Sequence, residues 1–138
     1  MAKSIRETMT SNPCSIDATK SVAYAAKMMR DEDVGIAPIV KGDRLVGVLT
    51  DRDIAVRVVA EGRDAEQVTV AEVASSDVVT VDPQQDLDEA LRLMARHQVR
   101  RLPVVEEDGR LVGVVAQADV AKHADDKRTG ETVEKISQ

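Results

Sequence analysis

Apolar residues recur along the chain with two different spacings, and each spacing predicts a different kind of element. Two segments carry them at helical spacing and are expected to form amphipathic helices that bury one face. Four short aliphatic runs, at 37–40, 44–50, 102–105 and 110–116, predict strands that pair as two hairpins. The helical positions are Val22, Ala25, Ala26 and Met29 in the first segment, and Leu87, Ala90, Leu91 and Met94 in the second.

These elements occur twice because the sequence repeats itself. With a shift of 65 residues Asp17 lies over Asp82, and one residue is added at the turn "EEDG" before "RLVGV" recurs from Arg44 and from Arg110. An internal repeat of this length indicates one structural unit written twice. The predicted fold class is α/β (α+β), with two copies of the unit packed about a pseudo-two-fold axis.

Local signals predict where several elements begin and end. Ser4 and Thr69 are each followed three residues later by a glutamate, which is the capping-box pattern that opens a helix. A short strand is expected to end at Asp17 in the first copy and at Asp82 in the second. Because proline suits the first turn of a helix, Pro83 predicts that the long helix of the second copy starts at this point.

The repeat also predicts how the chain is divided. We expect a first copy at 4–62, a linker at 63–68, a second copy at 69–125 and a polar tail at 126–138. One copy alone is too short to bury much apolar surface, so the two copies should pack against each other. The final helix of the first copy is expected to begin near Asp51, with its counterpart in the second copy.

Composition and charge argue against several classes of function. The formal net charge of −6 does not suit nucleic-acid binding, which depends on basic groups that neutralise phosphates. The chain has no Phe or Trp, so it lacks aromatic platforms on which bases stack. No long apolar run predicts a membrane span and the start shows no signal peptide, so we expect a cytoplasmic protein. Cys14 is alone, cannot form an internal disulfide, and is expected to be buried.

Thr50 and Asp53 stand where the second strand of the first hairpin gives way to a helix, and two interpretations are open. In one, the pair is a further capping box with no other role. In the other, the Asp53 carboxylate accepts hydrogen bonds from the hydroxyls of a ribose while Thr50 lies near a phosphate at the helix start. An adenine would then lie among aliphatic side chains. Those expected to contact it are Ile16, Ile36 and Ala37.

The second copy keeps the aspartate as Asp119 but has Ala116 where the first copy has Thr50. An aspartate without a threonine partner favours the ribose role over the pure capping role. A lost hydrogen bond to a charged phosphate costs about 1.5–3 kcal/mol, or tenfold or more in affinity. We therefore expect two unequal sites, the first competent and the second weak or empty.

The duplicated unit, the prolines in "IAPIV" and "RLPVV", and the phrase "GVLTDRD" resemble a pair of cystathionine β-synthase (CBS) domains, also called a Bateman module. The likeness covers residues 4–125, and "LTDRDI" with "HQVRRLPV" is similar to small standalone two-CBS proteins, including hypoxia-response proteins. The resemblance implies two βαββα units, disc-like homodimers, and adenosyl ligands such as AMP, ADP, ATP or S-adenosylmethionine in two inter-repeat clefts. It also implies a phosphate contact from Arg101, for which an exposed arginine on a solvated rim is the alternative. Arg52 and Arg57 are interpreted as plain helix-surface charges.

No pattern of catalytic residues stands out, and no phosphate-binding loop or dinucleotide fingerprint is present, so we do not expect an enzyme. His97 and His123 are the only histidines, and two histidines need a further ligand or a dimer mate to hold zinc. The leading hypothesis is a regulatory sensor that binds an adenosyl ligand and acts on a separate, unknown protein effector. The alternative is a structural or stress-response dimer with vestigial nucleotide sites, which could bind a metal through its histidines.

Overall fold

The computed structural model describes residues 3–124, with side chains as far as Lys122, and these residues form two compact units. The continuous unit is Cys14–Val78. The split unit combines the described residues up to Pro13 with those from Val79 onward. The expected linker at 63–68 lies inside the continuous unit, and the expected tail at 126–138 lies outside the described residues. Among the described helices, none has the length and apolar character needed to cross a membrane.

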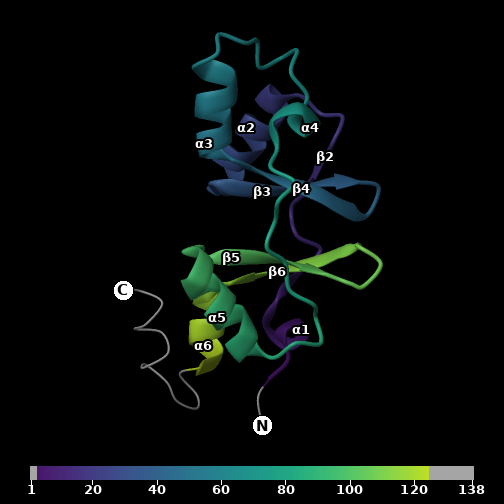
Figure 1. Cartoon of the computed structure of the whole chain (residues 1–138), viewed down its shortest axis with the longest axis vertical. Coiled ribbons are helices and arrows are strands. Elements are labelled where there is room, and N and C mark those ends of the chain that lie inside the picture. The colour runs from purple at the N-terminus through teal and green to yellow at the C-terminus, as the bar shows by residue number, and fades with distance from the viewer. Residues whose placement is uncertain (1–2, 125–138) are drawn as a thin grey trace. The chain divides into compact units, whose positions relative to one another are not determined.

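The continuous unit is a three-stranded sheet with its helices on one face (Figure 1). The strand order is β2-β3-β4, with β2 parallel and β4 antiparallel to the central strand. Ala37, Ile39 and Leu49 point from the hairpin into the core under the helices and are buried. The elements are β2 (Ile16–Asp17), α2 (Val22–Glu32), β3 (Ile36–Lys41), β4 (Arg44–Thr50), α3 (Asp51–Ile54), the π-helical turn η1 (Ala55–Val59) and α4 (Val70–Val73).

The split unit is also a three-stranded sheet with helices, built around the second hairpin, but its third strand is added differently (Figure 1). Its strand order is β1-β6-β5, and both pairings are antiparallel. Leu102, Val104 and Val115 fill the core together with apolar residues of the long helix. The elements are α1 (Ile5–Thr8), β1 (Thr10–Ser11), α5 (Leu87–His97), β5 (Arg101–Val105), β6 (Leu111–Ala116) and α6 (Gln117–Ala124). The predicted mixed α/β class, the two hairpins and the amphipathic helices are therefore confirmed.

The short helix that opens each sequence repeat packs in the unit that contains the other repeat's hairpin. After α4 the chain pairs Ser75 with Val48 of β4, and after α1 it pairs Thr10 with Val114 of β6. Both short helices have the predicted capping boxes, at Ser4 and at Thr69. The sequence repeats and the compact units therefore divide the chain at different places.

The repeated glycine of "RLVGV" makes this close pairing possible. A Cβ atom added to Gly47 would lie 2.7 Å from the Ser75 carbonyl oxygen. A Cβ atom added to Gly113 would lie 2.8 Å from the Thr10 carbonyl oxygen. Both contacts are too short for a side chain, so each glycine is needed for the backbone of an opening segment to approach the sheet.

The helix start predicted at Pro83 is wrong. The long helix of the second copy begins at Leu87, and Asp86 is its N-cap, with the carboxylate accepting from the Glu89 amide at 3.0 Å. Asp82 and Pro83 instead form a turn in which the Gln85 amide donates to the Asp82 carbonyl at 3.1 Å. Proline suits the second position of such a turn as well as the first turn of a helix, so the local signal was ambiguous.

We expect Gly47→Ala and Gly113→Ala each to lower the free energy of unfolding by about 1–3 kcal/mol, because the added methyl group forces the paired backbones apart. Urea denaturation of both variants measures this. Val46→Ala, at a strand position whose side chain is 42% exposed, is the control and should have a smaller effect. Wild-type unfolding midpoints for both glycine variants would contradict the role assigned to the close approach.

Candidate functional site

Thr50 is both the last residue of β4 and the N-cap of α3. Its backbone is extended, with φ −112° and ψ 161°, and its side chain turns back over the first helical turn. The Asp53 amide donates to Thr50 Oγ1 at 3.0 Å, and the Thr50 amide donates to Asp53 Oδ2 at 3.0 Å. This reciprocal pair is a complete capping box, so the capping contacts predicted for the motif are confirmed, while a further role of the pair stays a prediction.

The capping box does not use up the hydrogen-bonding capacity of the two side chains. Thr50 accepts through its oxygen and keeps its hydroxyl proton to donate, and Asp53 keeps the Oδ1 lone pairs. The Asp53 side chain is 16% exposed, so it can still be reached from outside. The Asp51 amide, in contrast, already donates to the Gly35 carbonyl at 2.9 Å. The ligand interpretation therefore depends on the two side chains more than on free amides at the helix start, and it stays a prediction.

The three aliphatic residues expected around an adenine have different surroundings. Ile36 is partly buried and pairs with Thr50 across the β3–β4 ladder, which places it beside the motif. Ile16 and Ala37 are each only 1% exposed and belong to the core of the continuous unit. The structure thus brings Ile36 to Thr50, whereas Ile16 and Ala37 serve as core residues.

The second copy of the motif lies at the start of α6 in the split unit. Arg101 pairs with Ala116 across the β5–β6 ladder, and the Gln117 amide donates to the Arg100 carbonyl at 2.8 Å. Asp119 is partly buried on the first turn of α6. A pocket of about 390 Å³ lies at this helix start. It is lined by Arg100, Arg101, Ala116, Gln117, Ala118 and Ala121. The second copy therefore offers two exposed cations and an aspartate, without the hydroxyl of the first copy.

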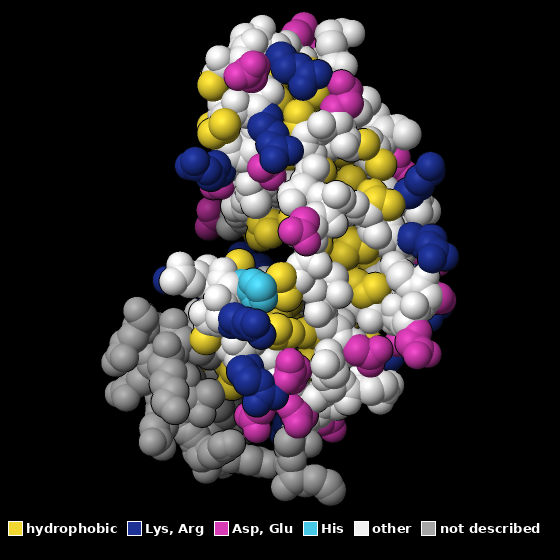
Figure 2. Space-filling view, viewed as in Figure 1, with side chains coloured by type: hydrophobic (Ala, Val, Ile, Leu, Met, Phe, Trp, Pro, Cys, Tyr) yellow, Lys and Arg dark blue, Asp and Glu magenta, His cyan; other side chains and the backbone are white. Residues whose placement is uncertain are grey.

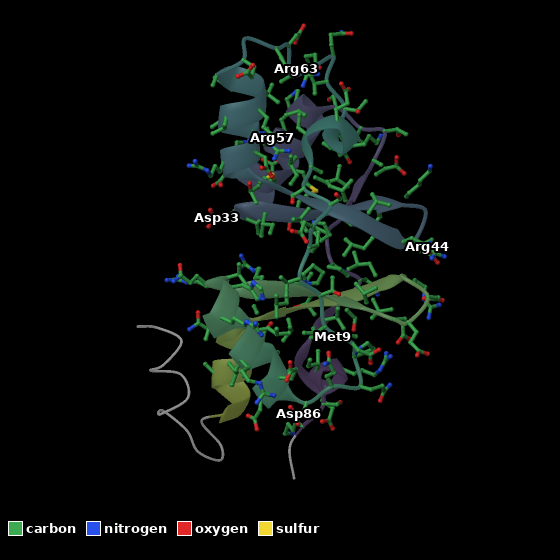
Figure 3. All side chains as sticks on the ribbon, in the orientation of Figure 1. Met9, Asp33, Arg44, Arg57, Arg63 and Asp86 are labelled. Carbon is green, nitrogen blue, oxygen red and sulfur yellow. The ribbon has the colours of Figure 1, made fainter. Side chains whose placement is uncertain are left out.

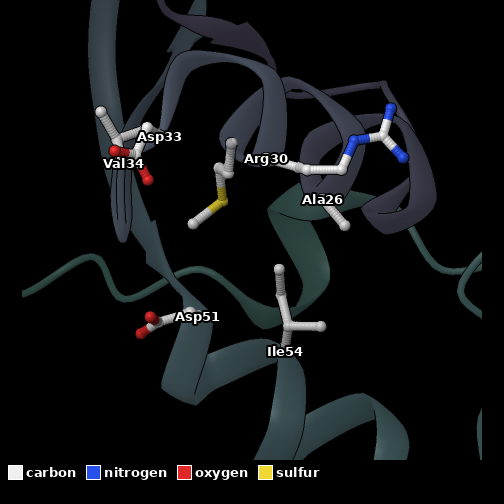
Figure 4. Close-up of a pocket in the computed structure, with 7 residues that line it drawn as sticks. Ala26, Arg30, Asp33, Val34, Asp51 and Ile54 are labelled. Atoms are coloured by element: carbon white, nitrogen blue, oxygen red, sulfur yellow. The ribbon is translucent and has the colours of Figure 1, made fainter.

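A pocket of about 360 Å³ lies between α2 and α3 in the continuous unit (Figure 4). Its apolar wall comes from α2, Val34 and Ile54, and its polar groups are Arg30, Asp33 and Asp51. In Figure 4 the Arg30 guanidinium points away from Asp51. Neither Thr50 nor Asp53 lines this pocket, so it is separate from the predicted ribose group.

Sequence reasoning missed the role of Arg57. This arginine was interpreted as a plain surface charge, but its Nη1 donates to the Val73 carbonyl oxygen at 3.1 Å. Its Nε lies 3.9 Å from Asp53 Oδ1, one helical turn back. The spacing of Asp53 and Arg57 could have suggested the second contact, because residues four apart face each other on a helix. No local sequence signal could have suggested the hydrogen bond to the Val73 carbonyl.

The remaining titratable candidates do not assemble into a site among the described residues. His97 is exposed at the end of α5, and the side chain of His123 lies outside the described residues. No cluster of three or more His, Cys, Asp or Glu side chains suited to a metal occurs in the described part of the chain. Cys14 was expected to be buried but is exposed. Partial desolvation, followed by the charge and hydrogen bond of Glu32, raises the pKa of its thiol, which disfavours a reactive thiolate.

Charged side chains of both signs are interspersed over the visible face of each unit (Figure 2). The acidic excess of the chain is therefore not gathered into one patch on that face. Pairs such as Arg6 with Glu106, at 3.3 Å, and Arg63 with Glu72, at 3.0 Å, occur within each unit. Such exposed pairs contribute little to stability.

Comparison with known proteins places these features in a family. The model of the CBS domain matches residues 2–60 and again 70–126. The CBS domain-containing protein YhcV of Bacillus subtilis (strain 168) is 43% identical over 118 residues, which are 86% of this chain and 83% of that protein.

Two solved structures are similar over nearly the whole chain. Hypoxic Response Protein I, solved with two coordinated zinc ions, is 39% identical with a TM-score of 0.79 and covers 88% of this chain and 98% of its own. CBSX2, solved in complex with AMP, is 25% identical with a TM-score of 0.77 and covers 91% of this chain and 98% of its own. With the family model matched over two segments, and with one three-stranded sheet in each compact unit, the chain belongs to the CBS domain family as a tandem CBS pair.

Proposed function

We propose that this CBS pair is a regulatory module that binds an adenosyl ligand, namely AMP, ADP, ATP or S-adenosylmethionine, through Thr50 and Asp53. The observation that carries the proposal is the reciprocal capping box. It fixes both side chains, with amide-to-oxygen distances of 3.0 Å, and leaves the Thr50 hydroxyl proton and Asp53 Oδ1 for a ligand. A carboxylate oxygen accepts well from ribose hydroxyls, and a hydroxyl donates well to a phosphate. CBSX2, solved with AMP, supports the ligand class.

The two copies of the motif should bind with different affinity. The first copy has hydroxyl and carboxylate on one helix turn. The second keeps Asp119 and gains Arg101 beside its pocket, but Ala116 cannot donate to a phosphate. A ligand held mainly by the first copy would bind one arrangement of the module more tightly than another. It would therefore shift the population toward the arrangement that it binds better. In this proposal the protein is a homodimer that passes the signal to a separate protein effector. The ligand does not have to be chemically changed.

Calorimetric titration with AMP, ADP, ATP and S-adenosylmethionine tests this proposal, with Asp53→Asn as the main variant. The asparagine oxygen can still accept from the Thr50 amide, so the helix cap is kept. Its NH₂ group would replace Oδ1, the oxygen proposed to face the ribose. The hydrogen bond from a ribose hydroxyl to the charged carboxylate is then lost. We expect binding of at least one of the four ligands by the wild type, weakened about tenfold or more in the variant.

Asp43→Asn is the matched control, because it removes a carboxylate from the exposed turn at the far end of the same hairpin. It should leave the affinity unchanged. If none of the four ligands gives heat or thermal stabilisation at millimolar concentration, the adenosyl proposal is wrong.

Metal binding through the histidines is the second candidate, favoured by the zinc ions named for Hypoxic Response Protein I. His97 is exposed at the end of α5, where a metal could reach it. Two histidines would need a further ligand, from this chain or from a second copy. This candidate suits a structural or stress-response dimer.

If this second candidate holds, zinc will raise the thermal unfolding midpoint of the chelator-treated protein, because a metal that binds only the folded state stabilises it. His97→Ala should abolish the zinc effect. Arg96→Ala, at the neighbouring exposed position, should keep it. Equal midpoints with zinc and with chelator in the wild type would rule out a stabilising site.

A further inference from the structure

Arg57 connects two parts of the continuous unit that are distant in sequence. It lies on η1, the π-helical turn that continues α3, and π turns occur often at functional sites. Its guanidinium has Asp53 Oδ1 on one side, 3.9 Å from Nε, and the Val73 carbonyl oxygen on the other, 3.1 Å from Nη1. One side chain therefore links the proposed ribose carboxylate to the last residue of α4.

The Val73 contact holds the end of α4. The last carbonyls of a helix have no partner within the helix and need one elsewhere. Val73 is 2% exposed, so its carbonyl has little access to water, and Arg57 supplies the donor. Immediately afterwards Ser75 pairs with Val48 of β4, with the Ser75 amide donating at 2.8 Å. Arg57 thus acts where α4 joins the sheet.

The contact between Arg57 and Asp53 leaves Asp53 Oδ1 available to accept a hydrogen bond from a ligand. At 3.9 Å the Arg57 Nε is too far from Oδ1 for a hydrogen bond, so it acts through its charge. Oδ2 is already held by the Thr50 amide. A ribose hydroxyl that binds Oδ1 would therefore meet a carboxylate fixed on one side by the cap and oriented on the other by a guanidinium anchored at Val73.

We propose that Arg57 is a positioning residue that couples occupation of Asp53 to the packing of α4. The proposal rests on the proposed function, because Asp53 is its ligand group. A bound ribose further restrains the carboxylate that the cap already holds. The charge of this carboxylate then keeps the guanidinium in place and favours its hydrogen bond to Val73. By reciprocity, an ordered α4 end improves ligand affinity. Since α4 opens the second sequence repeat, occupancy of the first-copy motif is transmitted across the repeat boundary.

Amide hydrogen exchange at the end of α4 measures this coupling, since it reports local opening. The probes are the Ala74 amide, which donates to the Val70 carbonyl at 2.9 Å, and the Ser75 amide. In the wild type, saturating AMP should slow their exchange about fivefold or more, although neither is a ligand contact. In Arg57→Met, which keeps the aliphatic stem but has no donor or charge, AMP should bind several-fold more weakly. At saturation it should leave the exchange of both amides unchanged.

Arg63→Met is the matched control. Arg63 also holds α4, through a 3.0 Å contact with Glu72, but among the described residues it forms no hydrogen bond or ion pair with Asp53. Both arginines are labelled in Figure 3, on the side of the sheet that carries the helices. The control should exchange faster without ligand and still respond to AMP. A preserved AMP response in Arg57→Met, or an equal loss in Arg63→Met, would overturn the proposal.

A ligand-free double-mutant cycle separates failure of this proposal from failure of the proposed function. Asp53→Asn and Arg57→Met, alone and together, are compared by Ala74 exchange without nucleotide. We expect the two effects to be non-additive by about twofold or more, as for residues in one network. Additive effects would overturn the Arg57 link, whatever the protein binds. Absence of heat and of thermal stabilisation with all four adenosyl ligands in the wild type would overturn the proposed function, whatever the cycle shows.

Discussion

The change from strand to helix at a single residue, Thr50, is the constraint on which the rest of the candidate site depends. Because Thr50 ends β4 and caps α3, no loop separates the sheet from the helix, and the helix direction is fixed by the strand. The capping box then fixes the Asp53 carboxylate against the Thr50 amide. One turn later η1, which continues α3, places Arg57 within reach of both Asp53 and Val73. Helix capping and ligand recognition are therefore compatible uses of the same two side chains.

Features that depend on local chemistry could be predicted from the sequence. The hairpins, the amphipathic helices and the capping boxes at Ser4, Thr50 and Thr69 follow from residue spacing alone. The placement of the short opening helices could not be predicted in this way, because a four-residue helix carries no local signal for the unit that it joins. The repeated glycine of "RLVGV" was the available clue, since a glycine inside a strand often marks a close backbone approach. Only the structure shows which segment approaches each glycine.

The candidate site was predictable to the same extent. Thr50 and Asp53 could be proposed from the sequence because a hydroxyl and a carboxylate three residues apart suit both a cap and a ribose phosphate. Arg57 was missed because its hydrogen-bond acceptor lies 16 residues further along the chain. Its counterpart in the second copy is His123, and Thr50 is matched by Ala116, so the second copy lacks both the proposed coupling arginine and the hydroxyl of the proposed ligand site. The two copies thus share a framework, while the first copy alone carries the full set of proposed ligand and coupling groups.

The most direct test of the central claim is a two-dimensional NMR titration of the ¹⁵N-labelled protein with AMP, followed through the backbone amides of both motif copies. The account predicts that the amides of Thr50 and Asp53 shift at the lowest AMP concentrations, and that those of Ala116 and Asp119 respond only at higher concentrations. Shifts that appear first or solely at the second copy would contradict the assignment of the ligand to the Thr50–Asp53 pair.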